Sequence, residues 1–306
     1  MKNFLHSFFL LGCVAVIGAA TSFAQAKRSI TVVTEPNARV WINGVLYGTT
    51  DENGKLEIKT VPPGRRTLRI LAPNFAEVNR PLPPTQRGEI KIALIETRDP
   101  AELAFHEGER QATLDRAKAE AAYRKAIAAN PKLISAHVGL LRNLAEGRSY
   151  EKALVALREL RKVSPRNAEA SAIEGRIHKD LGDEAKAIAS FKRAIAEGGG
   201  FQPEAYAGLG LLYQSRAEVL GDDVDQQRAA YNEAAKNLKT AVEQLSGAPD
   251  AATIYQLIGM IYEEQKRYKE AIALYEDFLK TFPDSAEAEA VRSFIVQIKK
   301  EMAIQQ

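Results

Sequence analysis

The segment YKEAIALYEDFLKTFP, at residues 268–283, carries the pattern that decides the fold of this chain. Its marked residues, Ala271, Tyr275, Phe278 and Pro283, are separated by four, three and five positions. Side chains three or four positions apart lie on one face of a helix, and a proline cannot continue a helix. The segment therefore predicts a helix that buries one face and ends before its proline.

The pattern recurs upstream at a constant interval. The segments YRKAIAANP, at 123–131, and KALVALRELRKVSP, at 152–165, end in prolines that lie 34 residues apart. A small residue stands twelve positions before each proline or its counterpart, and a bulky residue stands eight positions before it. The small residues are Ala119, Ala153, Ala187, Ala234 and Ala271, and the bulky residues are Tyr123, Leu157, Phe191, Leu238 and Tyr275. A segment that recurs in this way indicates a repeated structural unit.

This unit resembles the tetratricopeptide repeat (TPR), whose length is 34 residues. The family's Leu-Gly-x-x-Tyr motif has counterparts in LGLLY, at 209–213, and IGMIY, at 258–262. The resemblance covers residues 99–284, with five units that agree, and implies an all-α solenoid of paired antiparallel helices. Gly210 or Gly259 and the recurring alanine would then lie where the paired backbones approach most closely.

Two features depart from a regular array. The fourth repeat is lengthened by an insertion near residues 217–233, which either extends both of its helices or forms a protruding loop. After the last repeat, residues 285–306 predict a C-terminal capping helix and tail. Such a helix covers the apolar face of the last repeat, as solenoids require.

Residues 27–98 have a different period, in which apolar and polar residues alternate. Turn signals such as Asn43-Gly44 and Asn53-Gly54 separate the alternating runs. Short strands divided by frequent turns predict a small antiparallel β-sandwich ahead of the solenoid. The side chains expected to face its core are Ile30, Val32, Val40, Ile42, Leu56, Ile58, Leu68, Ile70, Ile90, Ile92 and Leu94.

The same region resembles the PEGA domain. The matching segments are TEPNARVWINGVLYGTT, at 34–50, and VPPGRRTLRILAPNF, at 61–75, although Thr50-Asp51 replaces the proline that usually follows Gly-Thr. The resemblance implies a cell-surface or envelope protein and transfers no catalytic residue. Alternation directs Trp41 away from the sandwich core. It would then either contact a partner or pack on the helical domain.

Residues 1–26 predict a signal peptide. Lys2 precedes an apolar run at 4–20, and the segment closes on Ala-Gln-Ala at 24–26, a small-x-small pattern typical of cleavage. We expect a mature protein that begins at Lys27, has no membrane span and is periplasmic or secreted. The alternatives are an anchor that is not cleaved and lipidation at Cys13, against which the apolar residues after Cys13 argue. Because Cys13 is the only cysteine, the mature chain would form no disulfide.

The sequence contains no recognisable catalytic or metal-binding constellation. The 306 residues carry a net charge of +3, too small to indicate a nucleic-acid partner. His106, His137 and His178 fall in different repeats without ligand spacing. The acidic run DDVD, at 222–225, lacks the glycine and distal glutamate of an EF-hand loop. We therefore expect no enzymatic activity, no cofactor and no metal.

The concave side of the solenoid is the predicted binding surface. Arg142 and Arg176 occupy the same position in successive repeats, where a basic pair could hold a carboxylate of an acidic partner segment. The alternative is a solvated surface without a ligand. The candidate partner-binding residues are Arg142, Ala172, Arg176, Lys179, Ala207, Leu211, Gln214 and Met260, together with Trp41.

These patterns predict a protein–protein interaction scaffold of the cell envelope that holds partner polypeptides in its concave groove. The alternative is a module that binds cell wall or polysaccharide through the β-sandwich, led by Trp41.

Overall fold

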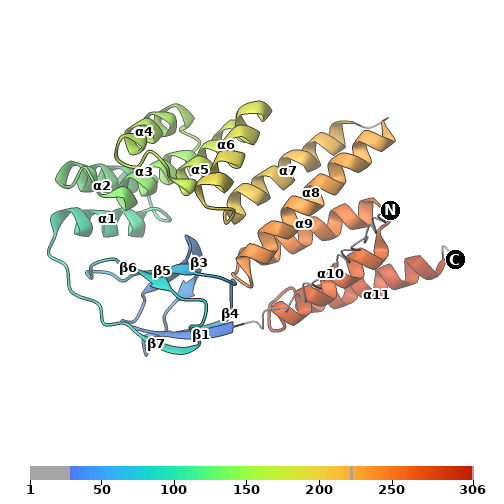
Figure 1. The fold of residues 1–306 in the computed structure, drawn as a ribbon, viewed down its shortest axis with the longest axis horizontal. Coiled ribbons are helices and arrows are strands. Elements are labelled where there is room, and N and C mark those ends of the chain that lie inside the picture. The colour runs from blue at the N-terminus through green and yellow to red at the C-terminus, as the bar shows by residue number, and fades with distance from the viewer. Residues whose placement is uncertain (1–27, 221–222, 305–306) are drawn as a thin grey trace, which may run out of the picture.

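The computed structural model describes residues 28–220 and 223–304. The predicted signal peptide, including Cys13, lies outside these residues. Strands occur only in the N-terminal part of the described chain, and helices follow from Pro100 onward (Figure 1). The predicted fold class, a small β-sandwich followed by an all-α solenoid, is confirmed.

The N-terminal part, which we call the β-domain, consists of two sheets that share one core. The first sheet contains, in spatial order, β4 (Lys55–Val61), β1 (Arg28–Val33) and β7 (Gly88–Lys91), and the second contains β3 (Val45–Thr49), β2 (Arg39–Ile42), β5 (Arg66–Leu71) and β6 (Val78–Leu82). Of the predicted core residues, Leu56 and Leu94 are half-buried and the others are buried. One pairing departs from the expected antiparallel arrangement. After β6 in the second sheet the chain crosses to the first sheet, where β7 pairs parallel to β1.

The helices form five successive pairs and a final single helix within the described residues. The pairs are α1 (Pro100–Gln111) with α2 (Arg116–Ala129), α3 (Ile134–Glu146) with α4 (Tyr150–Val163), α5 (Ala168–Asp180) with α6 (Glu184–Glu197), α7 (Pro203–Val219) with α8 (Val224–Leu245) and α9 (Ala251–Glu264) with α10 (Tyr268–Thr281), and α11 (Ala288–Ile304) follows. Three of these helices are capped at the N-terminus by a side chain that accepts hydrogen bonds from backbone N–H groups of the first turn. The capping residues are Asp99, Asp115 and Asn167. None of the described helices combines the length and the apolar character needed to cross a membrane.

Small residues allow the two helices of a pair to pack closely. The five recurring alanines are all fully buried. A Cβ atom added at Gly210 would lie 2.5 Å from the Leu238 side chain and 3.2 Å from the Ala234 carbonyl oxygen. At Gly259 it would lie 2.5 Å from the ring of Tyr275. The glycine of the first helix therefore mainly makes room for the bulky residue of the second.

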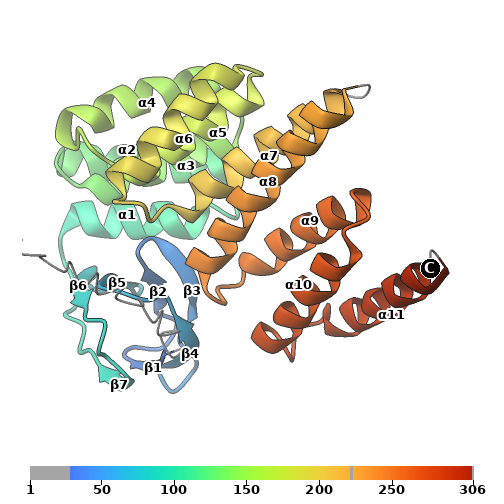
Figure 2. The ribbon, with the colours of Figure 1, turned by 45° about the vertical axis from the view of Figure 1, so that its right-hand side comes forward.

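The insertion extends both helices of the fourth pair. Helices α7 and α8 have 17 and 22 residues, whereas α5 and α6 have 13 and 14. The joined ends of α7 and α8 consequently project beyond the other pairs (Figures 1 and 2). At the end of the array, α11 buries Val291, Ile295 and Ile298.

The helical pairs curve over the β-domain, which contacts both ends of the array (Figure 1). Trp41 packs in one hydrophobic cluster with Phe105 of α1. At the other end, the Tyr47 hydroxyl donates a hydrogen bond to the Leu245 carbonyl at 2.7 Å. The β-domain is thus packed into the helical array rather than tethered beside it.

Candidate binding surfaces

The predicted groove residues come from the first helices of successive pairs. Arg142 lies on α3, Ala172, Arg176 and Lys179 lie on α5, Ala207, Leu211 and Gln214 lie on α7, and Met260 lies on α9. Their spacing along each helix directs them to one side, because residues three and four apart share a face.

The two predicted arginines are not free. Arg142 donates to the carboxylate of Glu169, one helical pair further on, and the Nη1 atom of Arg176 lies 3.6 Å from the Oε1 atom of Glu204. These glutamates recur at one repeat position, as the arginines do. The predicted basic pair is therefore not open to an acidic partner in the free protein, because each guanidinium already faces a carboxylate of the chain. The third predicted cation, Lys179, is paired too, with Asp180 at 2.8 Å.

Glu109 on α1 joins this row of charges to the β-domain. Its carboxylate accepts from Arg39 at 2.9 Å and from the Tyr123 hydroxyl at 2.7 Å, and Arg142 lies 4.0 Å away. The Glu109 side chain is only 7% exposed. Burial alone would raise its pKa, but Arg39, Arg142 and the Tyr123 hydroxyl together hold the pKa below its usual value. The carboxylate is thus a buried anion stabilised from both domains.

The accessible part of the groove lies on α7 and α9. Ala172 is fully buried with Leu209 and offers no surface to a ligand, which corrects its prediction as a contact residue. Ala207, Leu211 and Gln214 are half-buried. Met260 is 61% exposed. The concave face therefore presents apolar and amide groups toward its C-terminal half, beyond the paired charges.

Trp41 is not a surface residue. Its side chain points away from the sandwich core, as alternation predicts, but it is only 8% exposed because it packs against α1. The guanidinium carbons of Arg39 and Arg69 lie 5.1 and 4.6 Å from its ring centroid. The prediction that Trp41 contacts a partner or a polysaccharide is corrected, and the alternative of packing on the helical domain is what the structure shows.

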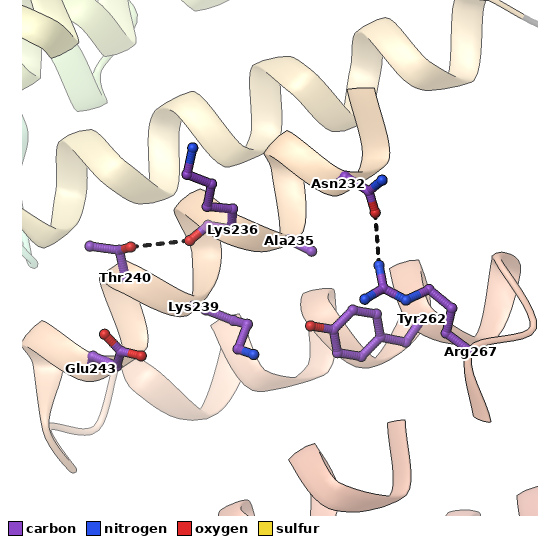
Figure 3. Close-up of a pocket in the computed structure, with 8 residues that line it drawn as sticks. All are labelled: Asn232, Ala235, Lys236, Lys239, Thr240, Glu243, Tyr262 and Arg267. Carbon is purple, nitrogen blue, oxygen red and sulfur yellow. Dashed lines mark hydrogen bonds between the residues drawn. The ribbon is translucent and has the colours of Figure 1, made fainter. Parts of the chain in front are cut away.

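A second surface, which the sequence did not reveal, lies between α8 and the turn from α9 to α10. Two adjoining hollows of about 350 and 390 Å³ share Asn232 and Arg267, and we call them together the outer cleft. Figure 3 shows the Lys239 ammonium and the Tyr262 hydroxyl pointing into the space between the helices. The outer cleft belongs mainly to a second helix of a pair, so it is separate from the groove on the first helices.

Within the described residues, His106, His137 and His178 lie on three different helices, α1, α3 and α5. The Nε2 atom of His137 lies 2.9 Å from the Pro131 carbonyl oxygen. In residues 28–220 and 223–304, no group of three or more His, Cys, Asp or Glu side chains is arranged to hold a metal ion.

Comparison with known proteins agrees with the helical part of the fold. Residues 138–203 and 220–286 match the family model described as tetratricopeptide repeat. The matched residues run from α3 to just beyond α10 and do not include the β-domain. No curated protein matches the chain.

Solved structures share the fold at low sequence identity. Yeast Tom70 is 17% identical, with a TM-score of 0.53 over 68% of this chain and 42% of that chain. The APC/C hetero-tetramer Cut9-Hcn1 contains a chain 16% identical, with a TM-score of 0.51 over 67% of this chain and 37% of that chain. MamA is 23% identical, with a TM-score of 0.43 over 63% of this chain and 97% of that chain. This chain thus spans less than half the length of the first two, whose likeness shows the fold alone.

Proposed function

We propose that this protein is a non-catalytic scaffold that binds partner polypeptides on the concave face of its helical repeats. Stacked tetratricopeptide repeats form extended concave surfaces that serve for binding. A surface held by packed helices loses little conformational entropy when a peptide binds. The partner's backbone and apolar side chains would lie across the first helices of the last pairs.

The observation that carries this proposal is the exposure of Met260 on the concave side of α9. A methionine that is 61% exposed is available for contact with another chain. Methionine is flexible and polarisable, so it adapts to different apolar side chains. We therefore place the main contact on α7 and α9.

An acidic partner segment remains part of the proposal in a modified form. A carboxylate of such a segment would have to displace the carboxylate of Glu169 or Glu204, which pairs with Arg142 or Arg176 in the free protein. This exchange is easier at Arg176, whose pair is separated by 3.6 Å and is not a hydrogen bond at that distance. Double substitution of Arg142 and Arg176 by alanine would then weaken the binding of an acidic peptide but not the binding of an apolar one.

We also propose that the protein works in the cell envelope after export. The support comes from the sequence of residues 1–26 and from the PEGA-like segments, which lie in the β-domain. N-terminal sequencing of the protein recovered from an export-competent host should find Lys27 first. A retained Met1, or a lipid on Cys13, would contradict release of the protein in soluble form.

Site-specific photo-crosslinking tests the concave contact. A benzophenone side chain placed at Met260 in the full-length exported protein should form covalent adducts with envelope polypeptides. The same group at Lys192, an exposed position on the second helix α6, is the matched control. Adducts that form equally at both positions, or only at Lys192, would move the binding surface away from the concave face.

A further inference from the structure

The extra turns of α8 build one wall of the outer cleft. In α6 the recurring Ala187 lies three residues after the first helical residue, whereas Ala234 lies ten residues after the first residue of α8. A helix rises 1.5 Å per residue, so α8 gains about 10 Å at its N-terminal end. Three residues of this extension, Val224, Gln227 and Arg228, line the hollow beside the α9–α10 turn. This hollow thus owes part of its wall to the insertion in the fourth repeat.

The lining of the outer cleft is predominantly cationic. It includes five basic residues, Arg228, Lys236, Lys239, Lys266 and Arg267, and two acidic residues, Glu243 and Glu264. Three of the cations have ion-pair partners close in sequence: Lys236 pairs with Glu233, Arg267 with Glu270 and Arg228 with Asp225. Among the described residues, neither Lys239 nor Lys266 forms an ion pair. One unpaired ammonium group therefore comes from each wall.

Arg267 is held in position before any ligand binds. Its guanidinium donates to Asn232 at 2.9 Å and to Glu270 at 3.0 Å, and it lies 4.5 Å from the ring centroid of Tyr262. Its backbone N–H also donates to the Tyr262 carbonyl at 2.7 Å, after Lys266 turns the chain with φ of 54°. A guanidinium restrained in this way loses little freedom when it binds an anion.

We propose that the outer cleft binds an acidic segment of a partner polypeptide, with one carboxylate held between Lys239 and Arg267. The two ammonium groups without ion-pair partners in the part of the chain that the structure describes, Lys239 and Lys266, favour an anionic ligand. The exposed apolar wall of the cleft is Val224, which is 57% exposed, whereas Tyr231 and Ala235 line the cleft but are themselves buried. A peptide that alternates acidic and apolar side chains matches both features, whereas a uniformly charged polysaccharide would leave the apolar wall uncovered.

This site is independent of the concave groove. The cleft walls belong to α8, the C-terminal end of α9 and the α9–α10 turn, and the predicted groove residues Ala207, Leu211, Gln214 and Met260 do not line it. The protein can therefore hold two polypeptides at once, one on each side of the fourth and fifth pairs.

Fluorescence anisotropy with a defined probe tests the proposal on the full chain. The probe is a fluorescein-labelled peptide of four Asp-Glu-Leu repeats, and its counterpart of four Asn-Gln-Leu repeats carries no charge. Lys239→Gln with Lys266→Gln should raise the Kd of the acidic peptide by about tenfold or more, because two charge-assisted contacts are lost. Both lysines are exposed, so the melting temperature should not change.

The matched control is Lys125→Gln with Lys192→Gln, which removes the same charge from exposed positions on α2 and α6. The acidic peptide should bind this variant as it binds the wild type. Equal weakening in the two double variants, or equal affinity for the charged and uncharged peptides, would overturn the proposal. A third outcome would also overturn it. In that case the acidic peptide does not bind, dextran sulfate does, and the substitutions of Lys239 and Lys266 abolish the binding of dextran sulfate.

Discussion

The hydroxyl of Tyr47 in β3 donates a hydrogen bond to the carbonyl oxygen of Leu245, which lies 198 residues later at the end of α8. Both residues are buried. Burial raises the pKa of the Tyr47 hydroxyl, so the group remains a donor throughout the physiological range. This bond ties the β-domain to the C-terminal repeats, while Trp41 ties it to the first repeat.

Tyr47→Phe should therefore destabilise the protein. It removes one of two donors to the Leu245 carbonyl, which keeps its bond from the Ala248 N–H, so the loss of one buried hydrogen bond should cost about 0.5–1.5 kcal/mol. Urea unfolding followed by the fluorescence of Trp41, the single tryptophan, measures this change. Tyr150→Phe is the control, because it removes an equivalent hydroxyl whose bond to Asp180 is exposed. A loss that is equal in the two variants would show that the Tyr47 bond does not hold the domains together.

Glu109 should make stability depend on pH in the acidic range. Its pKa in the folded protein is lower than usual, so the folded state binds its proton less readily than the unfolded state does. Its contribution is complete above the ordinary glutamate pKa of about 4.3 and is lost as the pH falls through the folded-state pKa.

Glu109→Gln tests this contribution. At pH 7 the substitution should cost about 3 kcal/mol, because it leaves Arg39 and Arg142 without their shared carboxylate. The difference in the free energy of unfolding between wild type and variant should shrink as the pH falls below about 4. Glu276→Gln, at an exposed position, should have little effect at either pH. A difference that stays constant from pH 7 to the acid range would mean that the Glu109 charge contributes nothing.

Gly259→Ala should destabilise the protein although alanine favours a helix. Alanine normally stabilises a helix by about 0.5–1 kcal/mol relative to glycine. Here the new methyl group would lie 2.5 Å from the ring of Tyr275 and still closer to its hydroxyl, so overpacking should cost about 1–3 kcal/mol. The double variant Gly259→Ala/Tyr275→Phe should lose less stability than the sum of the losses in the two single variants. A variant more stable than the wild type would show that the pair has room at this crossing.

Ala271→Leu tests the packing of the recurring alanine. Ala271 is fully buried at the crossing of α9 and α10, so a leucine should cost about 1–3 kcal/mol. Lys269→Leu introduces the same side chain at an exposed position of the same helix and should change stability by less than about 0.5 kcal/mol. Thermal unfolding of the two variants compares them, and equal melting temperatures would show that the helical register is wrong.

The sequence by itself determined the repeated unit and the β-sandwich. Helical and strand periods of 3.6 and 2 residues are local properties of the chain, so Ala271 and Tyr275, or Val40 and Ile42, could be assigned to buried faces without a structure. The insertion was visible for the same reason, because it interrupts a regular interval, although only the structure decided that it extends α7 and α8.

The candidate site depended on contacts between distant segments. Arg142 and Arg176 were recognised by their common repeat position, but their partners lie one pair further on, at Glu169 and Glu204. A signal was present, since those glutamates also recur at one position. The burial of Trp41 had no such signal. Alternation specifies the direction of a side chain from its own sheet, whereas what covers it depends on how β2 packs against α1.

The outer cleft arises from the same kind of non-local contact. In the sequence, Lys239 and Arg267 have the pattern of surface cations, and nothing distinguishes them from other surface lysines and arginines. They converge only because α8 lies beside the α9–α10 turn. Periodicity determines which face of an element is buried, but the docking of elements that are far apart in the chain determines which charges and rings meet.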